Sequence, residues 1–392
     1  MDSILIKNVL LGNSKRNILI EGQRFKCLDA ASGAEARTVI DATDKAILPA
    51  LYNTHTHTPM TLLRGYADDM PLEKWLSNYI WPYENHMTDE DFGRGSSLAA
   101  REMVGSGTVF FNEMYFGIRK SMDAAVVSGM RAAIGLCVLN GHKHSMSSES
   151  IAAMEPIQDP TGGRISFTVA PHSVYMVSGP ELKKLAKVAR DKGMKIHIHL
   201  SETATEVANC VRDHGMRPVE YLDSLGVLGP DVIAAHCVHI NEQEADLLAE
   251  RQVVISHCPC SNMKLGSGRF PYEIMIKAGC RITLGTDGAS SGNNLDLREA
   301  MKFAALLAKS CGDPVLLPAE QVFEWATVRG AEAFGIDAGE IKEGKLADCL
   351  LIDLNDVRMQ PCHNLVSNFV YSADTACIDT VICDGNVIYK KA

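Results

Sequence analysis

The sequence predicts an α/β protein in which a TIM-type (β/α)8 barrel carries a small β-sandwich formed by the N- and C-terminal segments. Three observations lead to this prediction. Strand-like runs alternate with helical segments across the middle of the chain, strand-rich stretches flank that region, and histidines and carboxylates recur where the central strands end. With 392 residues and 46% hydrophobic content, the chain can bury the core of one large barrel.

The flanking segments contain short runs of alternating hydrophobicity that turn residues interrupt. Near the N-terminus, strands are expected at residues 4–10, 17–21 and 38–41. Near the C-terminus, they are expected at 348–354 and 379–391, where Asp384-Gly385-Asn386 reads as a hairpin turn. We therefore expect one composite β-sandwich domain from residues 1–50 and 345–392, and a barrel from residues 51–344.

The middle of the chain supplies eight expected strands, the number that closes such a barrel. They are the run that ends at His55 and residues 107–115, 131–139, 164–173, 195–202, 232–238, 253–259 and 281–288. Helices are expected between them, for example at 180–193, which closes on Gly193, and at 241–252. Residues 140–163 are expected to form a loop, a lid or a helix-containing insertion.

Charge and cysteine usage exclude several classes of protein. The chain has 38 basic and 48 acidic residues and no basic tract, so no nucleic-acid partner is expected. No apolar run reaches the roughly 18 residues that span a bilayer, and no signal-peptide pattern opens the sequence. Because the 12 cysteines are scattered, reduced thiols and a cytoplasmic location are expected, with no membrane partner.

The stretch "NTHTHTP", residues 53–59, places two histidines where an apolar run ends. In a strand, residues two apart point to the same face, so His55 and His57 would project together. Two neutral imidazoles that converge suit a metal ion, although 13 histidines in one chain also produce close pairs by chance. Further ligands are therefore needed to support a metal site.

Other chemically able side chains fall at the expected ends of barrel strands. These are His172, His199, His236 and Asp287, with Glu202 in the loop after His199. Alone, His236 reads as a core histidine and Asp287 as a helix cap or turn former. Together, three imidazoles and a carboxylate form a set typical of zinc or iron(II). Of the pair His197 and His199, His199 is expected nearer the rim and His197 inside the barrel.

Cys258 and Cys260 in "SHCPCSNMK" are interpreted as structural. One class of zinc deaminases uses H-x-E followed by P-C-x-x-C. Here Met263 occupies the last cysteine position and no H-x-E occurs.

Several longer stretches resemble a known group. They include "LPALYNTHTHTPMTLLRGYADDMPLEKWL", "IWPYENHM", "APHSVYMVS", "IHIHLSET", "AAHCVHI", "SHCPCSNMKLGSG" and "LGTDGASSGNNLDL". Over nearly its full length, the chain resembles the amidohydrolase superfamily, and within it the metal-dependent aminohydrolases that act on purines and related heterocycles. The nearest resemblance is to 5′-methylthioadenosine/S-adenosylhomocysteine deaminases.

The resemblance implies a metal-dependent deaminase of adenosine-type nucleosides and assigns residues to it. The implied ligands of a single metal ion, Zn2+ or alternatively Fe2+, are His55, His57, His199 and Asp287. The implied catalytic residues are Glu202, which shuttles protons, His236, beside the attacking water, and Asp287. The implied substrate-binding residues are Trp75, Glu84, Arg164, His172 and Glu202. Of these, Glu84 would accept from ribose hydroxyls, His172 would contact the purine, and Arg164 the amino-acid tail. A homo-oligomer, dimer or tetramer, is also implied.

Two departures from the group's pattern affect this assignment. Where the subgroup often carries a further Arg, this chain has His142, Lys143 and His144, which puts the contact to a homocysteine carboxylate in question. Glu113 replaces a shorter Asp and is expected to support the site, to cap a helix or to be solvated. Binuclear relatives carry a bridging lysine at a strand end, and because none is found here, one metal ion per subunit is expected.

Two alternatives remain. The first is an aminohydrolase or chlorohydrolase acting on another heterocycle, such as guanine, 8-oxoguanine, a pterin or a triazine, because loops set the substrate on this scaffold. The second is a metal-binding barrel without catalytic activity, and the extra acid and imidazole, Glu202 and His236, argue against it.

Overall fold

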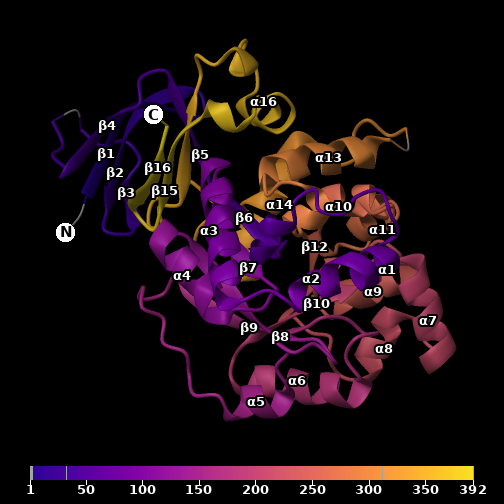
Figure 1. The fold of residues 1–392 in the computed structure, drawn as a ribbon. Coiled ribbons are helices and arrows are strands. Elements are labelled where there is room, and N and C mark those ends of the chain that lie inside the picture. Colours follow the sequence, from indigo (N-terminus) through magenta and orange to yellow (C-terminus); the bar gives the residue numbers. More distant parts are fainter. Residues whose placement is uncertain (1–2, 32, 311, 392) are drawn as a thin grey trace.

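The computed structural model describes residues 3–31, 33–310 and 312–391. A sheet of eight parallel strands, hydrogen-bonded in sequence order from β6 to β13, lies at the centre of the chain (Figure 1). Its strands are β6 (Leu51–Thr56), β7 (Thr108–Glu113), β8 (Arg131–Val138), β9 (Ile165–Pro171), β10 (Lys195–Leu200), β11 (Val232–His236), β12 (Val254–His257) and β13 (Arg281–Leu284). All eight barrel strands predicted from the sequence are therefore confirmed.

Hydrogen bonds between the first and last strands nearly close this sheet into a barrel. Thr54 Oγ1 donates to Leu284 O at 2.9 Å, and the backbone N–H of Asp287 donates to His55 O at 3.1 Å. These contacts bring residues more than 200 positions apart to the same end of the barrel, where β6 and β13 both terminate. The predicted fold class is confirmed.

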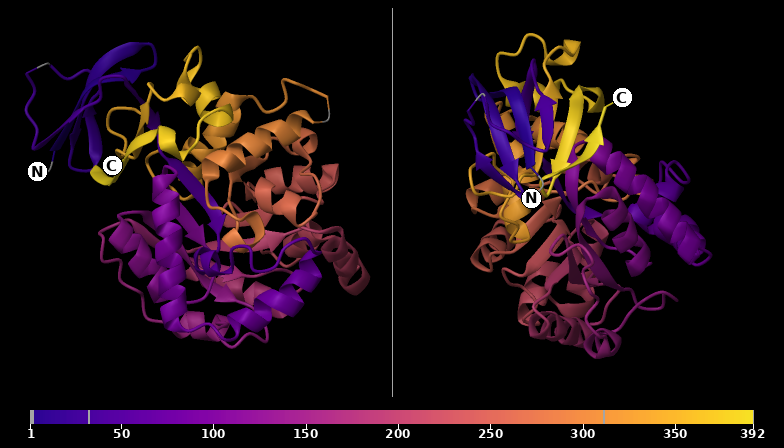
Figure 2. Two further views of the ribbon diagram at one scale, coloured as in Figure 1. Left: turned by 45° about the horizontal axis from the view of Figure 1, so that its top comes forward. Right: turned by 90° about the vertical axis from the view of Figure 1, so that its left-hand side faces the viewer.

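Helices surround the barrel and follow most of its strands (Figure 2). The longer ones are α3 (Asp89–Gly105), α4 (Ile118–Ser128), α6 (Gly179–Asp191), α7 (Ala204–His214), α9 (Glu242–Glu250), α13 (Leu297–Lys309) and α14 (Ala319–Ala326). Shorter ones are α1 (Leu72–Trp75), α2 (Trp81–Glu84), α5 (Ser148–Ala153), α8 (Pro218–Ser224), α10 (Pro259–Lys264), α11 (Tyr272–Lys277), α12 (Ala289–Gly292), α15 (Val328–Ala333) and α16 (Leu365–Tyr371). The 3-10 helix η1 (Thr58–Leu63) follows β6, a π-helix, η2 (Leu76–Ile80), joins α1 to α2, and the 3-10 turns η3 (Val357–Met359) and η4 (Thr375–Cys377) lie near the C-terminus.

Local sequence signals account for where several helices begin and end. Thr88 and Asp91 form a reciprocal capping box at the start of α3, and Asn241 and Glu244 do the same for α9. Gly193, with φ of +65°, follows the end of α6, which confirms the helix predicted at 180–193. The uncertain segment 140–163 contains the short helix α5. No helix among the described residues is both long and apolar enough to cross a membrane.

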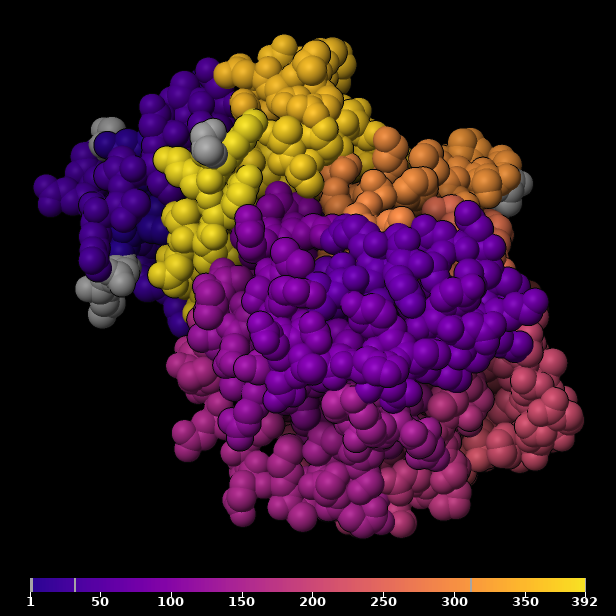
Figure 3. Space-filling view, in the orientation of Figure 1, coloured from indigo at the N-terminus to yellow at the C-terminus, as the bar shows by residue number. Residues whose placement is uncertain are grey.

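The two terminal segments share a second, mixed sheet. Figure 3 shows the indigo surface of the N-terminal segment next to the yellow surface of the C-terminal one. Its strands are β1 (Ser3–Leu11), β2 (Ser14–Glu21), β3 (Arg24–Cys27), β4 (Thr38–Asp41), β5 (Lys45–Pro49), β14 (Cys349–Asp353), β15 (Ile378–Cys383) and β16 (Asn386–Lys390). β5 pairs with β14, which joins the N-terminal strands to the C-terminal ones. Apolar side chains from both segments, such as Ile18, Phe25 and Leu351, form one buried cluster.

The predicted hairpin turn between the last two strands is present. Asp384 and Gly385 both have positive φ, as a two-residue hairpin turn requires. A Cβ at Gly385 would lie 2.0 Å from Gly22 O, so glycine is also required for space. The terminal segments thus meet through close backbone packing, and the domain boundaries at residues 50 and 345 stay predictions.

A buried ion-pair cluster connects the terminal sheet to the base of the barrel. Arg131, at the start of β8, donates from Nε to Asp348 at 2.8 Å and from a terminal nitrogen to Asp384 at 2.5 Å. Tyr52 of β6 donates to the same Asp348 carboxylate at 2.6 Å. Since Asp348 is fully buried, these donors replace the water that its charge loses.

Candidate active site

Four side chains converge at the carboxyl ends of the barrel strands. His57 Nε2 lies 3.3 Å from His199 Nε2, and Asp287 Oδ1 lies 3.2 Å from His55 Nε2 and 3.1 Å from His57 Nε2. His55 lies in β6 and His57 directly follows it, His199 lies in β10, and Asp287 follows β13. The structure thus brings together the four side chains that the sequence suggested as metal ligands.

The outer nitrogen of each imidazole is held by a hydrogen bond that orients the ring. His57 Nδ1 donates to Met114 O at 2.5 Å, and His199 Nδ1 donates to His172 O at 2.8 Å. His55 Nδ1 lies 2.8 Å from Nε2 of His197, which is buried inside the barrel. With their Nδ1 atoms engaged, His57 and His199 present a lone pair on Nε2 to the centre of the cluster.

These donors fit one divalent metal ion. Ligands about 2.0–2.1 Å from a tetrahedral zinc ion lie about 3.3–3.4 Å apart, close to the separations found here. Buried His55 Nε2 lies 3.2 Å from Asp287 Oδ1 without a well-formed hydrogen bond, an arrangement that suits two ligands of one ion. Burial raises the pKa of Asp287, but the adjoining imidazoles of His55 and His57 outweigh it and hold that pKa well below its usual range. The carboxylate is therefore ionised, as a ligand must be.

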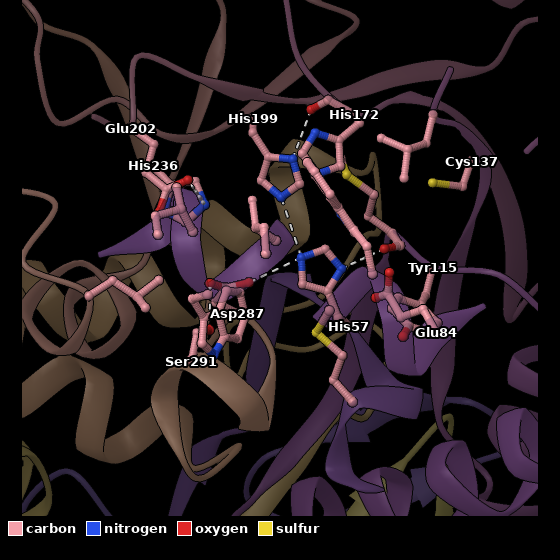
Figure 4. A pocket seen from close by; sticks show the side chains of 18 of the residues that line it. His57, Glu84, Tyr115, Cys137, His172, His199, Glu202, His236, Asp287 and Ser291 are labelled. Carbon is pink, nitrogen blue, oxygen red and sulfur yellow. Dashed lines mark hydrogen bonds and ion pairs between the residues drawn. The ribbon is translucent and has the colours of Figure 1, made fainter. Parts of the chain in front are cut away.

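A further imidazole, that of His236, and a further carboxylate, that of Glu202, lie beside this cluster (Figure 4). His236 Nδ1 donates to Asn262 Oδ1 at 2.8 Å, which leaves Nε2 3.8 Å from Glu202 Oε2. Ser267 Oγ donates to Glu202 Oε1 at 3.3 Å, and burial raises the pKa of Glu202. Glu202 can therefore hold a proton nearer to neutral pH than an exposed glutamate can.

The backbone at these strand ends has an uncommon conformation. Ser201, His236, Cys237 and Asp287 all have positive φ, between 49° and 71°. Positive φ is uncommon for residues other than glycine and tends to occur where a site requires a particular side-chain direction. Asp287 gains further support because its Oδ2 accepts hydrogen bonds from Ser261 and Ser291 at 2.6 and 2.8 Å.

A largely apolar pocket opens over the cluster. Helix α1, the π-helix η2 and α2 contribute Trp75 and Glu84 to its lining, and His172 lines it next to His199. The Trp75 indole N–H donates to Ala67 O at 3.0 Å, which fixes the orientation of this pocket-lining ring. Figure 4 shows Glu84 and Tyr115 on one side of the pocket and Glu202 and His236 on the other.

The prediction that Arg164 contacts the substrate is wrong. Arg164 precedes β9, whereas His172 follows the same strand, and a strand of seven residues separates them by roughly 23 Å. Arg164 donates to Met130 O at 2.8 Å and lies 4.0 Å from the Asp384 carboxylate, at the base of the barrel. It therefore packs toward the terminal sheet.

Sequence reasoning missed three residues that shape the site. Glu206 accepts the backbone N–H groups of Ser201 and Glu202 at 2.9 and 2.8 Å and so fixes the loop after β10. Tyr115 hydrogen-bonds Glu84, and Asn262 orients His236. Asn262 lies in the stretch that had been considered only for its cysteines, and the four-residue spacing from Glu202 to Glu206 was the available signal for that carboxylate.

Glu113 and Cys258 are buried, and Cys260 is partly buried. Glu113 accepts hydrogen bonds from the backbone N–H and the hydroxyl of Thr58, directly after His57, which rules out the solvated alternative. Burial raises the pKa of Cys258 well above its usual value and that of Cys260 to about 12. No cysteine belongs to a candidate metal cluster in the described part of the chain.

The profile of the Amidohydrolase family matches residues 46–388, nearly the whole chain. The chain belongs to the amidohydrolase family. This amidohydrolase is also 44% identical over 385 residues to a 5′-deoxyadenosine deaminase of Methanothermobacter thermautotrophicus, covering 97% of this chain and 90% of the relative. It is 42% identical to a 5-methylthioadenosine/S-adenosylhomocysteine deaminase of Archaeoglobus fulgidus, covering 99% and 93%. The predicted family is confirmed.

Solved structures agree with the fold. An adenosine deaminase from Xanthomonas campestris, determined with bound zinc, matches with a TM-score of 0.92 at 33% identity, over 98% of this chain and 92% of its own. A guanine deaminase from C. acetobutylicum matches with a TM-score of 0.87 at 21% identity, over 99% of this chain and 100% of its own, and shares the fold.

Proposed function

We propose that this amidohydrolase removes ammonia hydrolytically from adenosine-type nucleosides and yields the inosine analogue. The observation that carries the proposal is the position of Glu202 and His236, 3.8 Å apart, beside the four converging metal-ligand candidates. An acid and an imidazole at that place have no use in a structural metal site. Three relatives at 41–44% identity bear the names of deaminases of such nucleosides.

His55, His57, His199 and Asp287 would hold one Zn2+ or Fe2+ ion per subunit. When bound, the ion makes water acidic enough to act as a nucleophile near neutral pH. Asp287 accepts a proton of the attacking water, and His236 Nε2 holds the nucleophile in line with the amino-bearing ring carbon.

Glu202 carries the proton that the purine ring requires. As the water oxygen bonds to the amino-bearing carbon, the adjacent ring nitrogen gains a proton from Glu202. The carbon–nitrogen bond then breaks, and the amine leaves as ammonia with the proton held by Asp287. Glu202 regains a proton as the new C–O bond becomes a carbonyl, so water and nucleoside are converted to product and ammonia without another reactant.

Ammonia release over a small panel tests the reaction. The zinc-loaded protein is assayed with adenosine, 5′-deoxyadenosine, 5′-methylthioadenosine, S-adenosylhomocysteine, guanine and a pterin. We expect release from the adenosine compounds and a fall in kcat of about 100- to 10,000-fold in Glu202→Gln, because a general acid contributes that much. Zinc content should not change in this variant, and Glu250→Gln, at an exposed position, serves as control. Release from guanine or the pterin alone contradicts the substrate assignment.

Metal analysis tests the ligand set. We expect about one ion per chain, lost together with activity in His199→Ala. Ser267→Ala should retain the ion, because the hydroxyl that it removes donates to Glu202 and not to a candidate ligand. Chelation followed by addition of Zn2+ or Fe2+ identifies which ion restores turnover. A fully metallated His199→Ala protein would contradict the ligand set.

A further inference from the structure

One buried imidazole next to the pocket has no part in the proposed reaction. His142 lies in the loop after β8, its side chain is 4% exposed, and its ring stacks on Phe116 with centroids 4.1 Å apart. The backbone N–H of His144 donates to His142 Nδ1 at 3.3 Å. Since Nδ1 accepts this bond, the neutral ring carries its proton on Nε2.

The protonated nitrogen of His142 points toward Glu84 without reaching it. His142 Nε2 makes no hydrogen bond among the described residues and lies 4.0 Å from Glu84 Oε2. This separation is too long for a direct hydrogen bond, yet a hydroxyl between the two can accept from His142 and donate to Glu84. A buried N–H with no partner is costly, so a ligand hydroxyl that satisfies it gains affinity.

The charges around this place disfavour a second carboxylate. Neither lysine nor arginine occurs among the described residues that line the pocket. Burial, with the nearby His144 and Lys143, lowers the pKa of His142 to about 4, so its ring is neutral at pH 7. The Lys143 ammonium is directed to Asn85 O. An anionic tail would therefore be close to Glu84 without a lysine or arginine in the pocket lining to offset the repulsion.

We propose that His142 and Glu84 together bind a ribose hydroxyl, and that the site selects adenosine compounds whose 5′ substituent is uncharged over those that carry an amino-acid tail. This inference rests on the proposed function and specifies its substrate class. In the stretch from His142 to His144, His142 supplies a neutral donor near Glu84, and the Lys143 ammonium contacts Asn85 O instead.

Substrate preference of the unmodified enzyme gives the first test. We expect kcat/KM for 5′-methylthioadenosine and 5′-deoxyadenosine to exceed that for S-adenosylhomocysteine at least 30-fold. In His142→Arg, this ratio of kcat/KM values should fall at least fivefold. Equal use of all three compounds overturns the inference while the proposed function stands. Failure to deaminate any adenosine compound overturns the proposed function itself.

Variants at His142 give the second test. His142→Phe keeps the stacked ring and removes the N–H, so we expect KM for adenosine to rise about tenfold with kcat within threefold. His142→Gln, which retains a donor, should recover most of this loss. One of the two compounds 2′-deoxyadenosine and 3′-deoxyadenosine lacks the bridging hydroxyl. Its KM should be the same for His142→Phe as for the unmodified enzyme. An equal loss with adenosine and both deoxyadenosines overturns the hydroxyl contact, and thermal unfolding verifies folding. Should His142→Phe not fold, His142→Gln and the preference of the unmodified enzyme decide.

Discussion

The imidazoles and carboxylates of the site are each fixed by a neighbour that has no chemistry of its own. Met114 O and His172 O hold the rings of His57 and His199, and Asn262 holds that of His236. Because these partners determine which nitrogen carries the proton, they also determine which nitrogen faces the centre of the site. Glu84 differs, because burial raises its pKa to about 7 and its protonation therefore changes with pH near neutrality.

We expect substrate affinity to fall as the pH drops below about 7. Burial raises the pKa of Glu84 to about 7, although the hydrogen bond from Tyr115 lowers it. Below that pH the group is protonated and loses an acceptor for ribose hydroxyls, so kcat/KM should fall about tenfold per pH unit, through KM. Steady-state kinetics between pH 5.5 and 8.5 measure this.

Glu84→Gln provides the comparison for this pH effect. Its side chain stays neutral, so KM should be high and independent of pH across the same range. Any pH dependence of kcat that arises at the metal-ligand cluster should remain in this variant. A KM that still rises at low pH in this variant would assign the effect to another group.

At the scale of elements, α3 holds the segment that follows the first two histidines. Thr61 Oγ1 in η1 donates to Gly95 O at 2.7 Å, and Thr58 Oγ1 lies 3.0 Å from Ser96 Oγ. The close approach depends on Gly95, where a Cβ would lie 2.5 Å from Pro59 O. The position of His57, directly before η1, is therefore coupled to a helix outside the barrel.

Gly95→Ala should destabilise the protein by about 1–3 kcal/mol, because overpacking against backbone cannot relax cheaply. It should also reduce metal occupancy, through displacement of η1. Gly105→Ala, in the same helix with open space around it, should be neutral or stabilising by up to about 1 kcal/mol. Chemical denaturation and metal analysis of both variants check this, and equal stabilities would refute the coupling.

The elements of this fold were more predictable than their contacts. Apolar strand-like runs located the barrel strands, and the two-residue repeat of a strand placed His55 and His57 on one face, because both properties depend on neighbouring residues. The contacts of Tyr115 with Glu84 and of His142 with Phe116 depend on how loops from different strands cross, which local pattern does not encode. Arg164 was misplaced because a residue beside a strand can lie at either end of the barrel, and the resemblance assigned it to the wrong one.

At the scale of the whole molecule, the cluster around Asp348 joins the terminal sheet to the barrel. We expect Asp348→Ala to cost about 3–5 kcal/mol, because Arg131 would keep a buried charge without its main partner. Asp191→Ala removes an exposed pair with Lys187 and should cost less than about 1 kcal/mol. Thermal and urea unfolding compare the two variants, and a similar small loss in both would show that the buried cluster contributes little.

The pairing of β5 with β14 also sets an order of events during synthesis. About 300 residues separate these strands, which at about 5–20 residues per second takes roughly 15–60 s to translate. Throughout that interval the backbone edge of β5 that later pairs with β14 has no partner, although the first barrel strands have already emerged. An unpaired edge of this kind invites association with other chains. The nascent protein therefore depends on its last 45 or so residues to remove a site of aggregation that its first 50 create.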